Sequence, residues 1–136
     1  MSRSGYNNDN IEDPWRWIMW RGAVASAIRG ARGQAFLREL IDTLDAMPKK
    51  TLVVGELQAD GEFCALGVVG QARGIDLTTL DTENWRQISD TFDIARPLAR
   101  EIMFENDEGS CWRDAKGTDR WAHMRRWAES KLNKTP

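Results

Sequence analysis

The nucleophilic chemistry open to this chain depends on two cysteines and a single histidine. Cys64 precedes an apolar run at 65–70, and the N-terminal end of a helix there would favour the thiolate form of its side chain. A cysteine nucleophile needs a base, for which His123 is the candidate, with Asn106 or Asp107 to orient it. The apolar neighbours of Cys64 instead fit a buried structural thiol. We therefore expect no catalytic residue, and we expect that the protein is not an enzyme.

Clustered carboxylates are the second candidate chemistry. Glu101 and Glu105 share a helical face, and Asp107 and Glu108 follow, so their oxygens could surround a divalent cation. A calcium-binding loop needs ligands at alternating positions, which the segment 106–117 does not supply. The two cysteines lie far apart in unlike surroundings, which indicates neither a zinc site nor a disulfide framework. The sequence thus predicts no metal and no cofactor.

The segment ISDTFDIARPLAREI at 88–102 resembles the core of a helix-turn-helix motif. Its apolar and small residues have the spacing of two short helices that meet at a steep angle. In that interpretation Arg96 and Arg100 of the second helix would point at DNA. Asp93 stands where the motif usually has a turn glycine, and the acids within 101–108 would repel phosphates. A helical hairpin that serves packing alone has the same spacing, so both interpretations stay open.

One face of the C-terminal segment gathers cations around a tryptophan. At 100° per residue this face lies beside the apolar face and is distinct from it. The indole could stack on a base or on an aromatic side chain of a partner. The alternative is a solvated helix whose tryptophan covers the edge of the core. The residues of this predicted partner-binding face are Arg120, His123, Trp127, Lys131 and Lys134.

Charge is distributed unevenly, although the formal net charge is −2. Residues 14–38 hold five arginines and no acid, and residues 112–136 hold seven basic and three acidic residues. The intervening segments 39–63 and 81–111 are net acidic. Either these helices neutralise each other as neighbours, or the first and last helices form a joint positive face. The cations of the first segment assigned to partner binding are Arg21, Arg29 and Arg32.

Helical periodicity dominates the chain and places these residues on elements. Trp15 and Ile18 fall outside the centre of the first helix's apolar stripe, and Asp60 and Gly61 indicate a turn. We expect a helical turn at 49–57, where β-branched residues also fit a short strand, and a loop at 106–117. Six helices are expected, over residues 14–29, 33–47, 62–73, 82–92, 96–105 and 118–132.

The chain of 136 residues is long enough for one domain with a shared core, and its 41% hydrophobic content fits a globular protein. We expect a mostly α-helical fold, a single bundle of about five to six helices that includes the helix-turn-helix-like pair. Residues 1–13 are expected to form a flexible tail and residues 14–136 the helical domain. With neither a secretory signal nor a long apolar run, we expect a cytoplasmic protein with no membrane partner.

Three blocks of sequence occur together with TDRWAHMRRW near the end: RWIMWRGAVASAIRGARGQAFLREL at 16–40, FCALGVVGQARGID at 63–76 and IARPLAREIMFENDEG at 94–109. In this combination the chain resembles an uncharacterised family of small proteins encoded by bacteriophages and prophages of proteobacteria. The resemblance covers most of the chain and brings no activity or site residue with it. It implies an accessory protein in the bacterial host cytosol that binds a host or phage macromolecule.

Seven tryptophans and the polarised charge also favour binding, because tryptophan and arginine dominate protein interfaces. We therefore expect a phage or prophage accessory protein that binds a host protein or nucleoprotein target, such as an anti-CRISPR-like inhibitor of host defence. The alternative is a helix-turn-helix transcriptional regulator that binds DNA through Arg96 and Arg100.

Overall fold

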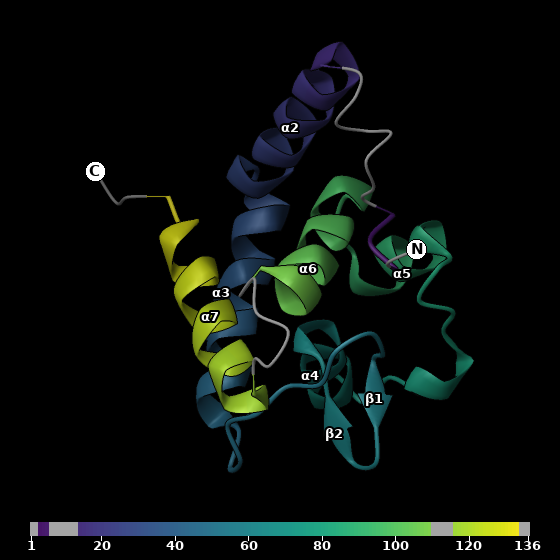
Figure 1. Cartoon of the computed structure of the whole chain (residues 1–136), viewed down its shortest axis with the longest axis vertical. Coiled ribbons are helices and arrows are strands. Elements are labelled where there is room, and N and C mark those ends of the chain that lie inside the picture. Colours follow the sequence, from purple (N-terminus) through teal and green to yellow (C-terminus); the bar gives the residue numbers. More distant parts are fainter. Residues whose placement is uncertain (1–2, 6–13, 110–115, 134–136) are drawn as a thin grey trace.

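The computed structural model describes residues 3–5, 14–109 and 116–133 (Figure 1). Within them the chain is mostly helical, and its six α-helices bury a shared core, as the sequence predicts. A short hairpin and one 3₁₀ turn, η1, complete the fold. The elements are α2 (Pro14–Arg29), α3 (Ala31–Ala46), β1 (Gln58–Ala59), β2 (Glu62–Phe63), α4 (Ala65–Ala72), η1 (Leu77–Thr79), α5 (Trp85–Phe92), α6 (Arg96–Glu108) and α7 (Gly117–Ser130).

Helices α2 and α3 follow each other almost without a break and are joined at Gly30. Residue 33 is glycine at their close approach, because a Cβ atom there would lie 2.0 Å from the carbonyl oxygen of Ala27. α3 buries one continuous apolar side, whereas α2 buries Val24 and Ile28 near its C-terminal end. The N-terminal half of α2 therefore extends past the other helices (Figure 1).

Residues 49–57 form no helical turn, so that expectation is wrong. The backbone here bonds to the hairpin instead: the Val53 N–H donates to the Phe63 carbonyl at 2.9 Å. The β-branched side chains of this segment favour such an extended conformation. The expected turn is confirmed, since Asp60 and Gly61 both have positive φ, 51° and 80°, and join β1 to the antiparallel β2.

Helix α4 begins at Ala65, later than predicted, because residues 62–63 belong to β2 and Cys64 caps the helix. Close packing requires a glycine within α4. A Cβ atom at Gly67 would lie 1.9 Å from the carbonyl oxygen of Leu57. The absence of a side chain thus lets α4 press against the segment that precedes the hairpin.

Helices α5 and α6 form the helical pair that the pattern at 88–102 predicts. Asn84 caps α5 by accepting a hydrogen bond from the Gln87 N–H at 3.1 Å, slightly later in the chain than predicted. Asp93 ends α5 with φ 55°, the left-handed conformation that a turn glycine would adopt. α6 continues to Glu108, into the segment expected to be a loop.

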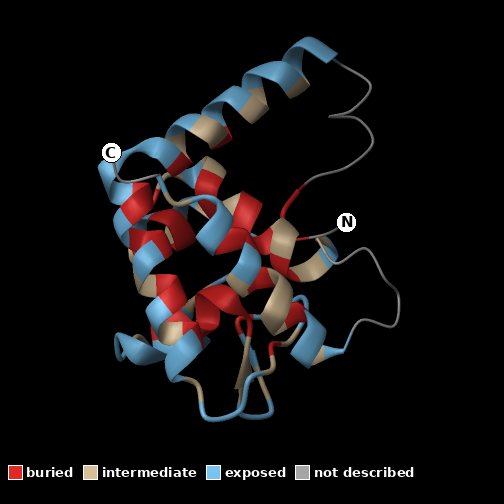
Figure 2. Cartoon of the chain, turned by 90° about the vertical axis from the view of Figure 1, so that its left-hand side faces the viewer, coloured by how far each residue is buried: buried red, intermediate tan, exposed pale blue. Residues whose placement is uncertain are grey.

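Helix α6 lies at the centre of the bundle and packs against α2, α4, α5 and α7. Leu98, Ala99, Ile102 and Met103 of α6 have no exposed surface. α7 closes the bundle on α3 and α6, and buried residues fill the space between these helices (Figure 2). None of the helices in the described part of the chain has the length and apolar character needed to span a bilayer.

Candidate functional site

Ion pairs join each of the two basic segments to an acidic segment on a neighbouring helix. Arg21 of α2 makes a two-pronged ion pair with Glu101 of α6, at 2.8 and 2.9 Å. Arg125 of α7 pairs with Asp45 of α3 at 3.0 Å, and its hydrogen bonds lower the pKa of the Asp45 carboxyl. This pairing agrees with the first of the two interpretations of the charge pattern, in which basic and acidic helices are neighbours.

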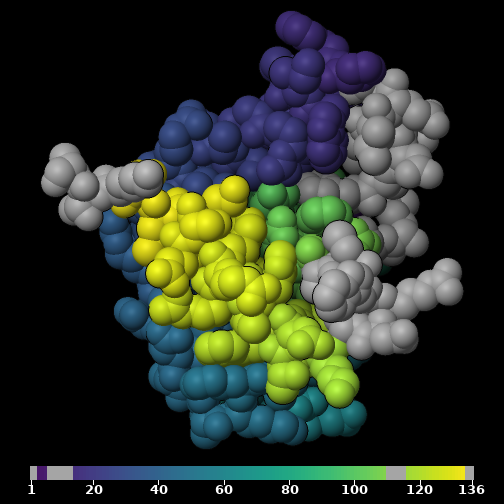
Figure 3. Space-filling model, turned by 60° about the vertical axis from the view of Figure 1, so that its left-hand side comes forward, coloured from purple at the N-terminus to yellow at the C-terminus, as the bar shows by residue number. Residues whose placement is uncertain are grey.

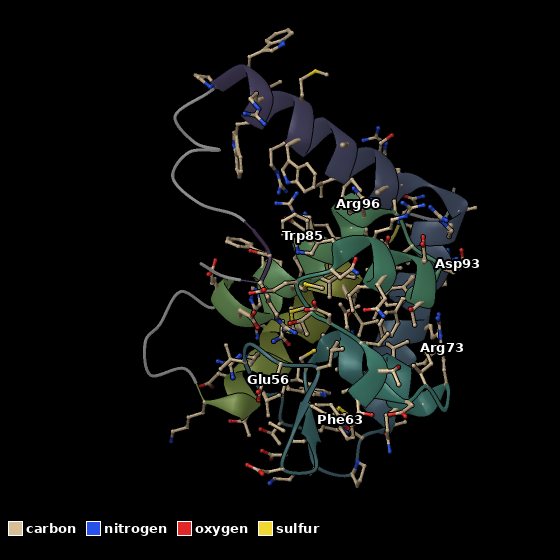
Figure 4. All side chains as sticks on the ribbon, turned by 90° about the vertical axis from the view of Figure 1, so that its right-hand side faces the viewer. Glu56, Phe63, Arg73, Trp85, Asp93 and Arg96 are labelled. Atoms are coloured by element: carbon tan, nitrogen blue, oxygen red, sulfur yellow. The ribbon has the colours of Figure 1, made fainter. Side chains whose placement is uncertain are left out.

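The two arginines of the helix-turn-helix-like pair have different surroundings. Arg100 lies between two indoles, with its guanidinium carbon 4.4 Å from the Trp20 ring centre and 3.9 Å from that of Trp85. Arg96 is exposed at the start of α6, beside Trp85 (Figure 4). A recognition helix needs one long side open to a DNA groove, whereas α6 is enclosed by four helices. The position of α6 favours the packing interpretation of this hairpin.

The face predicted for 118–134 is not a solvent-facing surface, because two of its members are buried. The Arg120 side chain is enclosed, and its Nε donates to the Asn106 carbonyl at 2.8 Å while Nη1 donates to the Leu52 carbonyl at 3.2 Å. Trp127 is 7% exposed and belongs to the core. α7 packs on both α3 and α6, so its buried side is wider than the apolar stripe in the sequence.

The remaining members of that face are separated from one another. His123 is paired, with its Nε2 2.8 Å from a carboxylate oxygen of Glu105 on α6. Gly109 leaves room for this contact, since a Cβ atom there would lie 2.5 Å from the histidine nitrogen. Lys131 is exposed just after α7, and Lys134 lies outside the described residues.

Cys64, His123 and Asp107 do not come together as a catalytic triad. Cys64 is 1% exposed, and its Sγ accepts hydrogen bonds from the Gly67 N–H at 3.4 Å and from Arg3 Nη1 at 3.5 Å. Asp107 pairs with Arg3 rather than with the histidine, at 2.7 and 2.9 Å. Burial acts to lower the pKa of Arg3, but the contacts with Cys64 and Asp107 outweigh it and raise this pKa.

Residues 3–5, here called the strap, are buried in the fold, although the sequence suggests a flexible tail there. Trp85 Nε1 donates to the Arg3 carbonyl at 2.7 Å, and Ser4 is 1% exposed. Gly5 has φ 75°, and a Cβ atom there would lie 2.4 Å from the Trp85 ring. The strap's partners are 61 to 104 positions away in the chain, so no local pattern reveals it. The rest of the predicted tail, 1–2 and 6–13, lies outside the described residues.

The solvent-facing side of α2 is unusually apolar. Trp15, Ile18 and Met19 are 71%, 60% and 62% exposed, and they are three of the four large apolar residues that are exposed in the described chain. The opposite side of α2 is apolar as well. Apolar residues on both sides are typical of a helix that is buried on both sides. The ridge, as we call this exposed side, consists of Trp15, Ile18, Met19, Gly22, Ala23, Ser26 and Arg29.

The N-terminal half of the ridge includes a shallow hollow. Its lining is Trp15, Arg16, Met19, Trp20 and Ala23, and most of its surface is apolar. In Figure 3, α2 forms the upper edge of the molecule, with this part of the helix at its tip. This position and the exposure of Trp15 and Met19 make the hollow accessible to another macromolecule.

The C-terminal end of the ridge is cationic. Arg29 is the last residue of α2, and its carbonyl accepts a hydrogen bond from Asn133 Nδ2 at 3.2 Å. Gln34 Nε2 donates to the Lys131 carbonyl at 3.0 Å, so the end of α7 lies at the junction of α2 and α3. The C-terminal ends of α2 and α7 thus meet here, and the side chains of Arg29 and Lys131 are both exposed. Arg32, also exposed, contacts Asp93 at 3.3 Å.

Other hollows and side-chain clusters in the described residues are weaker candidates for a functional site. They contain no group of three or more His, Cys, Asp or Glu side chains arranged to hold a metal ion. A hollow of about 200 Å³ beside the hairpin, lined by Met47, Phe63 and Val68 among others, is too small for most organic ligands. Comparisons of the chain with protein-family models, curated proteins and solved structures find no match.

Proposed function

We propose that this protein is a binding protein without catalytic activity that docks on a partner protein through the ridge of α2. One observation carries the proposal: Trp15, Ile18 and Met19 lie next to each other and are each more than half exposed. Exposed apolar patches on a folded domain are typical of interaction sites, and tryptophan is enriched among the residues that contribute most to binding.

A protein partner explains the ridge better than DNA does. The centre of the ridge is apolar, while two of the cations that the sequence suggests for partner binding already have partners within the chain: Arg21 is paired with Glu101, and the buried Arg120 donates to backbone carbonyls. DNA binding depends on several free cations facing phosphates. The resemblance to phage-encoded proteins supports the same view, since accessory proteins of this kind commonly bind host proteins, including components of host defence.

The proposal is tested by removing the apolar character of the ridge without changing charge. In the double variant Ile18→Gln, Met19→Gln, both side chains are already exposed and glutamine is a good helix former, so the fold should persist. Quantitative affinity purification from bacterial host lysate should recover a stoichiometric partner with the parent protein and lose it with the double variant.

The matched control is Val54→Gln, which changes an apolar residue that is 51% exposed and lies outside α2. This variant should retain the partner, and circular dichroism should show the same helical content in all three proteins. Recovery of no stoichiometric partner by the folded parent, or equal recovery by the double variant, would contradict the proposed function.

A further inference from the structure

We propose that the partner segment is an acidic amphipathic helix that lies along the ridge, with its apolar residues near Trp15 and its carboxylates near Arg29. This inference rests on the proposed function, in which the ridge docks on a protein. It adds the chemistry and the orientation of the segment that is bound.

The shape of the ridge fits a helix. α2 has 16 residues and is therefore about 24 Å long. Large side chains occupy its first two exposed turns, and small residues follow at Gly22, Ala23 and Ser26. A Cβ atom at Gly22 would have no heavy atom within 4 Å, so the surface there is low and open. A partner helix can approach closely over the small residues while its apolar side chains contact Trp15, Ile18 and Met19.

Charge determines which kind of helix fits. α2 contains no acidic residue. Arg29 follows Ile18 by eleven residues and Gly22 by seven, spacings that place all three on one helical stripe. Arg29 and Lys131 are both exposed at the end of this stripe, and neither side chain forms an ion pair with the described residues. Carboxylates of a partner would complement this end, and a cationic partner would be repelled.

The same features disfavour a second copy of this chain. Two ridges brought together would carry arginines and no acid to offset them. An acidic helix that lies along the ridge and reaches Lys131 supplies the carboxylates that a second copy of the ridge lacks.

Two synthetic peptides with one shared leucine stripe test this inference, one with glutamate and one with lysine at the remaining charged positions. Fluorescence anisotropy should show that the parent binds the glutamate peptide at least about tenfold more tightly than the lysine peptide, because opposite charges attract across the interface. Raising the salt concentration should weaken binding of the glutamate peptide.

Two double variants locate the binding site. The affinity for the glutamate peptide should fall by about tenfold in the variant Arg29→Gln, Lys131→Gln. The affinity for both peptides should fall in the variant Ile18→Gln, Met19→Gln. The matched control, Lys116→Gln, Arg126→Gln, removes two exposed cations at α7 and should leave the affinity unchanged.

Several results would overturn the acidic-helix assignment. They are no binding of the glutamate peptide, equal binding of both peptides, displacement of the peptide by duplex DNA, or a concentration-dependent dimer that Ile18→Gln, Met19→Gln abolishes. If lysate capture still depends on Ile18 and Met19 in that case, the proposed function stands and the partner has other chemistry.

Discussion

At the scale of single residues, a buried ion pair in the interior of this protein joins two residues that are 104 positions apart in the sequence. The side chains of Arg3 and Asp107 are 4% and 8% exposed, and they meet through two hydrogen bonds. Asp107 also accepts hydrogen bonds from the Gly55 N–H at 3.0 Å and from Asn106 Nδ2 at 2.9 Å. One carboxylate therefore holds the strap, the loop before the hairpin and α6 together.

Removing the Asp107 carboxylate should strongly destabilise the fold. Asp107→Ala leaves the Arg3 charge buried without its carboxylate partner, which costs about 3–5 kcal/mol of unfolding free energy. Urea denaturation followed by circular dichroism measures this loss. The double variant Arg3→Met, Asp107→Ala should be less destabilised than the sum of the two single variants, because neither charge is then left alone. Additive losses would show that the pair is not coupled.

A second residue-scale prediction concerns the ion pair between α3 and α4. Arg73 Nε donates to Glu39 at 2.8 Å, and this hydrogen bonding lowers the pKa of Glu39 from its ordinary value of 4.5. Because the folded pKa is below the unfolded one, the pair stabilises the fold above about pH 4.5, and this contribution is lost as the pH falls through the folded pKa.

Glu39→Gln should therefore lower the unfolding free energy at pH 7, by less than about 1 kcal/mol because the Glu39 side chain is 38% exposed. The difference between parent and variant should shrink as the pH is lowered below 4.5. Denaturation curves at a series of pH values measure this difference in unfolding free energy. A difference that grows in acid would contradict the stabilising role of the Glu39–Arg73 pair.

At the scale of elements, the two contrasting glycines of α2 and α4 show what the helices are packed against. Gly67 touches the backbone of Leu57, and Gly22 faces open space on the ridge. Gly67→Ala should destabilise the fold by about 1–3 kcal/mol, as overpacking does. Gly22→Ala should be neutral or stabilising by up to about 1 kcal/mol, because alanine is the better helix former.

Thermal denaturation of these two glycine variants separates the two environments. If Gly22→Ala lost as much stability as Gly67→Ala, the ridge would already be covered in the protein alone, and the surface described above would not exist. If Gly67→Ala were harmless, α4 would not press on the segment before the hairpin.

At the scale of the whole molecule, the helices were predictable because their apolar residues recur with helical spacing, and the helical character of 14–29 and 96–105 is confirmed. The strands of the hairpin are not evident in the sequence because each has only two residues, Gln58–Ala59 and Glu62–Phe63, too few for an alternating side-chain pattern. The strap is not evident because its partners lie far away in sequence.

The candidate site was partly visible in the sequence. Trp15 and Ile18 fall outside the buried stripe of the first helix, which is the signal of a second apolar side. Their exposure required the structure, because sequence alone does not show which side of α2 remains uncovered. The cations proposed from the sequence were less informative, since Arg100 and Arg120 satisfy interior partners that no local pattern identifies.

The most direct test of the ridge as a docking surface is oxidative footprinting of Met19 in the purified complex with the captured partner. Met19 is 62% exposed in the protein alone and should oxidise readily. In the complex its oxidation rate should fall several-fold, while that of Met47, which lies far from the ridge beside the hairpin, should stay the same. Unchanged oxidation of Met19 in a stoichiometric complex would contradict the account.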